Sequence, residues 1–153
     1  MYSPVSGSIQ GDQEGQLAII TRCNFTLFAE AVKLCCFTEE PIKIAFVGGP
    51  DAPGFNRILD IYLLMLPPEE REKTGRVITD GFVKMFEKQG LAAFEKYVNE
   101  TQDIEVLGKI KIVKTYTHQL PEHIAKIRSK TSKTQDMAGG LFVHKSLHII
   151  SFY

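Results

Sequence analysis

The first half of the chain alternates between short strand-like and helix-like apolar patterns. Residues 16–21 and 42–47 are apolar runs rich in β-branched side chains, which predicts two strands. Residues 25–36 lie between them and carry apolar side chains at helical spacing, so we predict a core-facing helix there. Residues 1–15, which are polar and rich in Ser, Gly and Gln, are expected to form a flexible lead.

A glycine- and proline-rich loop, Gly48 to Gly54, leads into a strongly apolar helix predicted over residues 55–66. Most apolar side chains of this helix fall on one face, as in a helix that covers a core. Leu64 falls opposite that face. The helix is therefore either buried on two sides or offers apolar surface, through Ile61 and Leu64, to a partner.

The second half begins with helical patterns. Two prolines end the apolar helix, and a short charged helix is predicted over residues 69–73. A longer helical stretch runs from Thr79 to Val98, and Gly90 can divide it into two pieces.

From Ile104 to Thr117 the pattern changes to alternation of lysine with Ile or Val, which predicts a strand with one solvent-facing side. A helix is predicted from Pro121, with Ile124 and Ile127 facing inward. Residues 129–140 are polar and predict a loop, and residues 141–153 predict a terminal strand.

This order of elements predicts an α/β (or α+β) fold. A single-layer sheet of about four strands would carry helices on one or both faces. Residues 16–153 are expected to form one globular domain, since a chain of 153 residues suffices for one core.

Composition sets the class of protein and excludes few functions. The chain is 44% hydrophobic and 24% charged, with zero formal net charge, so neither global disorder nor a strongly charged partner is implied. Three cysteines, Cys23, Cys35 and Cys36, do not suggest a disulfide framework. The longest apolar run, Ile61 to Leu66, is far shorter than the about 20 residues that cross a bilayer. A cytoplasmic location with no membrane partner is expected.

The loop after the second predicted strand is the first candidate for chemistry. A strand that leads through Gly48, Gly49, Asp51 and Gly54 into a helix presents backbone N–H groups suited to phosphate. The loop lacks the lysine and hydroxyl residue of a P-loop, and its two prolines each remove an N–H. A structural turn is therefore favoured over a ligand loop, and Asp51 is favoured as a turn residue.

A basic stretch is the second candidate, because seven basic residues between positions 109 and 133 accompany a single acidic one. Lys109 and Lys111 could supply positive charge to the loop, and the whole set could contact nucleic acid. The solvent-facing sides of strands and helices commonly carry lysine, and the chain is neutral, so nucleic acid is disfavoured as a partner. The seven residues are Lys109, Lys111, Lys114, Lys126, Arg128, Lys130 and Lys133.

Histidine and cysteine offer no complete catalytic or metal set. His144 and His148 on one strand would lie about 13 Å apart, too far to share an ion, and His118 and His123 have no partner ligands at metal-site spacing. The cysteines lie among apolar residues, where a free thiol acts as a small core side chain. We expect no metal and no cofactor.

These patterns favour a small non-catalytic binding or adaptor domain that acts through protein–protein contacts or self-association, with a protein partner or homo-oligomer. The alternative is a binding protein or enzyme for a small phosphate-bearing ligand that uses the Gly48–Gly54 loop. Whether the chain is an enzyme stays open.

Overall fold

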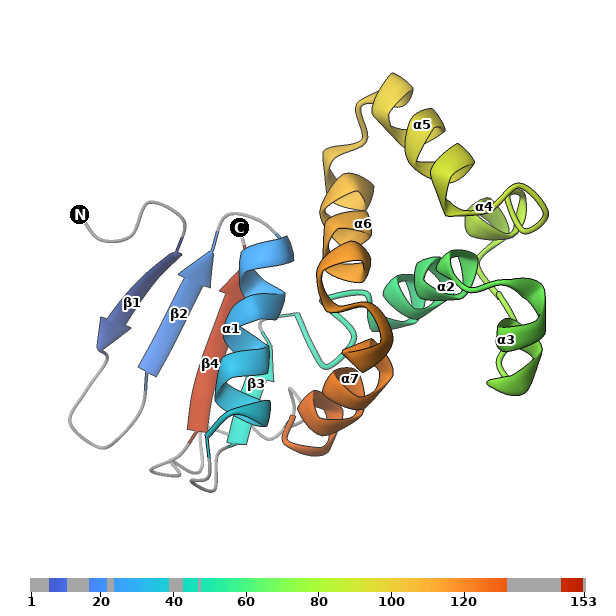
Figure 1. The fold of residues 1–153 in the computed structure, drawn as a ribbon. Coiled ribbons are helices and arrows are strands. Elements are labelled where there is room, and N and C mark those ends of the chain that lie inside the picture. Colours follow the sequence, from blue (N-terminus) through green and yellow to red (C-terminus); the bar gives the residue numbers. More distant parts are fainter. Residues whose placement is uncertain are drawn as a thin grey trace. The chain divides into compact units, whose positions relative to one another are not determined.

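The computed structural model describes residues 6–10, 17–21, 24–38, 43–46, 48–131 and 147–152 (Figure 1). The sequence predicts one domain over residues 16–153. The structure divides the chain into two compact units. Unit 1 comprises Met1–Pro53 and Glu122–Tyr153, and unit 2 comprises Gly54–Pro121.

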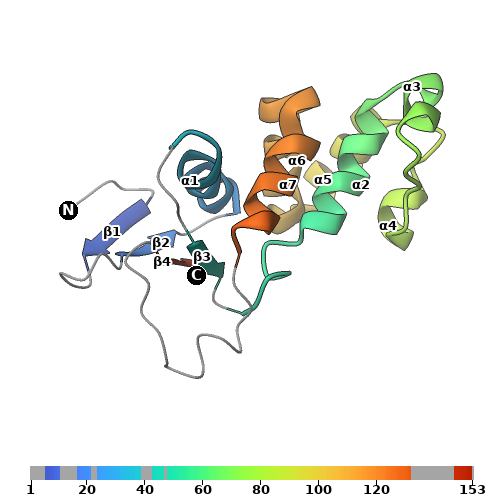
Figure 2. The same cartoon turned by 90° about the horizontal axis from the view of Figure 1, so that it is seen from below.

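Unit 1 contains strands contributed by both ends of the chain. They follow the order β1-β2-β4-β3, with β1 antiparallel to β2 and the other two pairings parallel. Helix α1 packs on β2 and β4 and lies over one face of these strands (Figure 2). The elements are β1 (Ser6–Gln10), β2 (Leu17–Thr21), α1 (Asn24–Cys36), β3 (Lys43–Phe46), α7 (Leu120–Ser129, in this unit from Glu122) and β4 (Leu147–Phe152).

The helices of unit 1 bury the apolar faces that the sequence predicts. In α1 the buried side chains include Leu27, Phe28 and Val32, and in α7 both Ile124 and Ile127 are buried. The Lys130 ammonium donates a hydrogen bond to the Cys35 carbonyl at 3.0 Å. A cation at the last turn of a helix satisfies a carbonyl that has no partner inside the helix.

Unit 2 is helical and is organised around α2, which packs against α4, α5 and α6. Most side chains of α2 are buried, including Ile61 and Leu64. The helix is thus buried on two sides, the first of the two alternatives that the sequence left open. The elements are α2 (Phe55–Met65), α3 (Pro68–Lys73), α4 (Gly81–Lys84), α5 (Leu91–Thr101), α6 (Ile104–Tyr116) and the 3₁₀ turn η1 (Thr117–Gln119).

Arg71 of α3 closes the end of α2. Its guanidinium donates to the carbonyls of Leu63 at 2.9 Å and Leu66 at 3.1 Å, and a third hydrogen bond reaches the Glu87 carbonyl at 3.2 Å. The planar fork of donors on arginine suits several acceptors at once. The C-terminus of α2, α3 and the segment after α4 are thereby joined through one side chain.

The predicted α/β fold is wrong for this chain, which is mostly helical. The described elements of unit 2, about half of the described chain, are all helices, so one sheet does not organise the molecule. The N-terminal lead also differs from its prediction, because Ser6–Gln10 forms β1.

The largest local error is the strand predicted between Ile104 and Thr117, which is helix α6. Its residues Val106, Ile110 and Val113 are buried at helical spacing, and Lys109 and Ile112 are buried on a second side. In a helix that is buried on two sides, apolar and polar residues can alternate along a short stretch of sequence, as they do in a strand. The Asp103 carboxylate accepts a hydrogen bond from the Val106 N–H at 3.2 Å and caps the helix.

Other element predictions are confirmed. Gly90 divides the stretch after Thr79 into α4 and α5, and the charged helix predicted over residues 69–73 is α3. The predicted loop beyond Thr131 and the start of the terminal strand lie outside the described residues. Among the helices that the structure describes, none is long and apolar enough to cross a membrane.

Candidate functional site

The loop Gly48–Gly54 is a tight turn built on glycine. Gly48, Gly49 and Gly54 have φ angles of 98°, 104° and 72°, in the region that side chains other than glycine rarely adopt. The Gly49 N–H donates to the Phe46 carbonyl at 3.0 Å, and the Ala52 N–H donates to the Gly49 carbonyl at 3.1 Å. Two backbone N–H groups of the loop are thus taken up by local hydrogen bonds. The Asp51 side chain is exposed.

Gly54 and Lys109 are the predicted ligand residues that the structure brings together. A Cβ on Gly54 would lie 2.9 Å from Lys109 Cε and 3.5 Å from its Nζ, so the lysine end lies at the N-terminus of α2. Lys109 is 5% exposed, and its ammonium lies 3.6 Å from the Glu105 carboxylate. Burial lowers the pKa of Lys109, and Arg57 lowers it further, while Glu105 opposes both. Lys111, in contrast, is exposed.

A carboxylate network lies beside this site. Asp60 is 5% exposed, and one of its oxygens accepts hydrogen bonds from Thr79 N at 3.2 Å, Thr79 Oγ1 at 3.2 Å and Asp80 N at 2.8 Å. Asp60 is not the ion-pair partner of Arg57, which lies three residues before it in α2. Instead the Arg57 guanidinium donates to Asp80 at 2.7 Å.

Asp80 begins α4 by accepting hydrogen bonds from the N–H groups of Phe82 at 2.9 Å and Val83 at 3.0 Å. Burial would raise the pKa of Asp80, but the hydrogen bonds from Val83 and Arg57 outweigh burial and lower it. Both carboxylates therefore act as structural acceptors that fix the segment from Thr79 to Val83 on α2.

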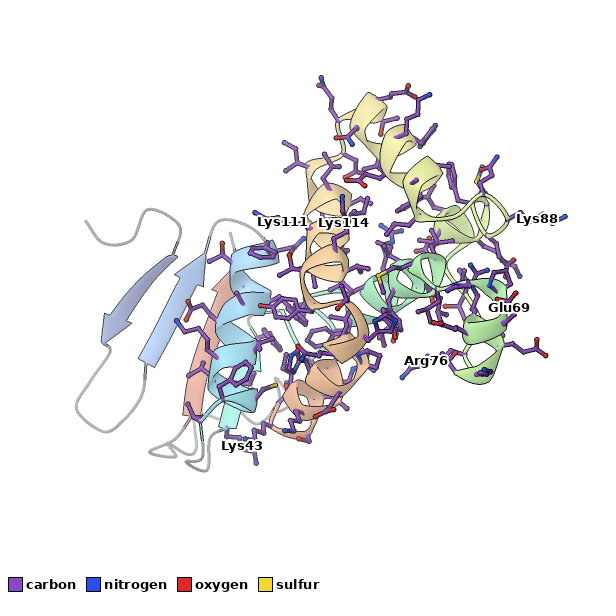
Figure 3. All side chains as sticks on the ribbon, viewed as in Figure 1. Lys43, Glu69, Arg76, Lys88, Lys111 and Lys114 are labelled. Atoms are coloured by element: carbon purple, nitrogen blue, oxygen red, sulfur yellow. The ribbon has the colours of Figure 1, made fainter. Side chains whose placement is uncertain are left out.

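The basic residues at the start of the stretch lie on helix α6 and not on the predicted strand. Lys109, Lys111 and Lys114 belong to α6 of unit 2, whereas Lys126, Arg128 and Lys130 belong to unit 1 and Lys133 lies outside the described residues. Lys114 pairs with Glu95 of α5 at 3.1 Å, and Lys126 lies 4.0 Å from Glu122. Figure 3 shows Lys111 and Lys114 extending from α6.

His123 and Cys35 lie in buried positions of unit 1. His123 is buried, with its ring centroid 5.9 Å from that of Phe37. Burial raises the pKa of the Cys35 thiol to about 12, which leaves it protonated at neutral pH. Within the described ranges, no three His, Cys, Asp or Glu side chains are placed to hold a metal ion. Cys23, His144 and the side chain of His148 lie outside those ranges.

Sequence reasoning missed a cluster of four aromatic rings where α4 meets α5. Phe82, Phe86, Phe94 and Tyr97 form this cluster, which we call the aromatic corner. Neighbouring ring centroids lie 5.1 Å apart for Phe82 and Phe94 and 5.5 Å apart for Phe86 and Tyr97. Phe94 is fully buried, whereas Tyr97 is 45% exposed.

Three exposed lysines belong to the segment that carries these rings. Lys84, Lys88 and Lys96 are exposed, and none of them forms an ion pair in the part of the chain that the structure describes. Figure 3 shows Lys88 projecting away from the helices just beyond α4. The sequence offered one signal for this surface, because Lys96 and Tyr97 are adjacent and Tyr97 lies three residues after Phe94.

Comparison with known proteins finds similarity over most of the chain. The chain is 36% identical over 143 residues to F-box DNA helicase 1 of Gallus gallus. The matched region covers 92% of this chain and 14% of that relative. No protein-family model matches the chain, and no solved structure matches it.

The similarity contradicts two predictions. A free-standing non-catalytic adaptor domain does not agree with a chain that matches a segment of a named DNA helicase along nearly its whole length. The same match contradicts the prediction that disfavoured nucleic acid. The prediction of self-association rested on apolar surface at Leu64, and this side chain is buried.

Proposed function

We propose that this chain is a DNA-contacting region of a helicase-related protein. The observation that carries the proposal is the 36% identity to F-box DNA helicase 1, which extends over 92% of the chain. Because the chain spans 14% of that relative, the proposal concerns contact with DNA and not a complete unwinding reaction.

The charge distribution is compatible with local contact to phosphates. The net charge is zero, so attraction by the whole chain cannot supply the binding free energy. Exposed basic side chains lie on both units, including Lys111 of α6 and Lys126 of α7. In this proposal Lys111 contacts phosphate, whereas buried Lys109 holds the start of α2. A DNA-contacting chain would act in the compartment that holds DNA, in place of the predicted cytoplasmic location.

Fluorescence anisotropy with labelled oligonucleotides tests the proposal. We expect the 153-residue chain to bind single strands of about 16 nucleotides, a length that spans a typical single-strand site. With about three phosphate contacts, raising salt from 50 to 200 mM should weaken binding by about 20-fold. Unlabelled DNA should reverse the signal. If anisotropy stays flat at 50 mM salt up to about 100 µM protein, the weak end of non-specific DNA affinity, the proposed function fails.

A further inference from the structure

We propose that the aromatic corner of unit 2 is a stacking platform for a base of single-stranded DNA. The inference rests on the proposed function and names the surface and the form of DNA that it takes. Tyr97 is the ring that stacks on the base, and Lys84, Lys88 and Lys96 contact the flanking phosphates.

The packing of the corner holds Tyr97 in place before any ligand arrives. Its ring lies 5.9 Å from that of Phe82 and 5.5 Å from that of Phe86, and both phenylalanines rest on buried Phe94. These separations are those of favourable aromatic pairs. A ring that is fixed by its neighbours loses little conformational entropy when a ligand stacks on it.

Exposure distinguishes this corner from an ordinary core cluster. Tyr97 is 45% exposed although three other rings lie at the same corner, and Met85, between Phe82 and Phe86 in sequence, is 74% exposed. Both side chains therefore offer surface that a ligand can reach. Apolar surface that is rimmed by charged residues marks a binding site more often than isolated apolar residues do.

The charges at the corner favour a polyanion over a protein partner. The nearby carboxylates of Asp80 and Glu95 are engaged by Arg57 and Lys114 respectively. Between residues 81 and 101, three lysines and two carboxylates, those of Glu87 and Glu100, are exposed. Protein interfaces are poor in lysine, whereas sites for single strands combine exposed aromatic rings with basic side chains.

The exposed ring also favours a single strand over a duplex. An unpaired base offers a free face, and stacking of a base on an aromatic side chain depends little on its identity. In a duplex both faces of an internal base are covered by neighbouring bases. Duplex DNA would therefore leave Tyr97 without a stacking partner.

Tryptophan fluorescence locates the base directly, because the natural chain contains no tryptophan. Tyr97→Trp places one reporter in the corner, and Phe37→Trp places a matched reporter at a 70% exposed aromatic position of unit 1. Titration of the full chain with oligothymidine should quench the fluorescence at position 97 and leave that at position 37 unchanged. Hairpin duplex at the same concentration should not quench at position 97.

Substitutions in the natural chain give a second measurement by anisotropy. Tyr97→Ala should weaken binding of the single strand by about 5- to 100-fold, the usual effect of removing one stacking ring, and Tyr97→Phe should retain it. Lys88→Gln should weaken binding and reduce its salt dependence, whereas Lys73→Gln, at an exposed position of α3, should leave both unchanged.

The outcomes separate this inference from the proposed function. If the natural chain binds the oligonucleotide but position 97 shows no quenching and Tyr97→Ala binds normally, the corner is not the site and DNA contact lies elsewhere. If the hairpin quenches position 97 as strongly as the single strand does, the single-strand assignment is overturned. If the natural chain binds no DNA, the proposed function itself fails.

Discussion

At the residue scale, single polar side chains join segments that are distant in sequence. The Asp60 carboxylate holds Thr79 and Asp80 against α2 through three hydrogen bonds, and Arg71 joins three carbonyls. Buried groups of this kind stabilise when all partners are present and cost stability when one partner is removed.

Asp60→Ala should therefore destabilise the chain by about 3 kcal/mol, since two N–H groups and a hydroxyl lose a charged acceptor. The free energy of unfolding in urea measures the effect. Asp51→Ala removes an exposed carboxylate and should change that free energy by less than about 0.5 kcal/mol. Equal losses of unfolding free energy in the two variants would contradict the predicted contribution of the Asp60 hydrogen bonds to stability.

His123 makes stability depend on pH below neutrality. Burial lowers its pKa from the ordinary value of 6.5, with Lys126 acting in the same direction and Glu122 opposing. Below pH 6.5 the unfolded chain takes up a proton more readily than the folded chain, so stability falls as pH falls through and below 6.5. Urea unfolding at several pH values between 7.5 and 5 should show this decline, and His123→Phe should remove part of it. An identical pH profile in the two proteins would contradict the assignment.

At the element scale, α2 and α6 meet at Gly54 and Lys109. The glycine has a φ of 72°, and its missing side chain leaves room for the end of the lysine. The loop before α2 therefore serves first to position the helix.

Gly54→Ala should destabilise unit 2 by about 1–3 kcal/mol, because alanine is strained at this φ and its Cβ would meet Lys109 Cε at 2.9 Å. Two matched variants separate the causes. Gly75 has a φ of 73°, close to that of Gly54, but open space around it, and Gly81 has open space without a positive φ. The urea midpoint should fall most for Gly54→Ala, less for Gly75→Ala, and stay level or rise for Gly81→Ala. A loss at position 54 no larger than that at position 75 would exclude the contact with Lys109.

The elements also show what the sequence can and cannot predict. Helix α2 follows from apolar spacing bounded by Gly54 and Pro67, and the break at Gly90 follows from that residue alone. Over Lys109 to Val113, a helix buried on two sides and a strand produce nearly the same alternation, and Asp103 was the available sign of a helix start.

The candidate sites could be predicted only in part. Gly54 and Lys109 were each proposed as ligand residues, but their proximity depends on how α2 packs on α6. The aromatic corner was not predicted, because Phe82, Phe86 and Phe94 have core spacing, and exposure of Tyr97 depends on the angle between two helices.

At the scale of the whole molecule, helix dominates and charge is balanced. The far-ultraviolet circular dichroism spectrum of the folded chain should therefore be that of a mainly helical protein. Helix-rich signal should be lost in the same urea range that exposes the buried thiol of Cys35 to thiol reagents. A spectrum dominated by strand would contradict the fold.

The burial of α2 has a consequence for synthesis of the chain. Helix α6, which covers α2, begins about 40 residues after α2 ends, and a ribosome needs about 2–8 s to add that length. During that interval the apolar faces of the nascent α2 have no partner from α6. Expression of shortened versions that stop before Ile104 should therefore yield aggregated material, and versions that extend past Tyr116 should be recovered more readily.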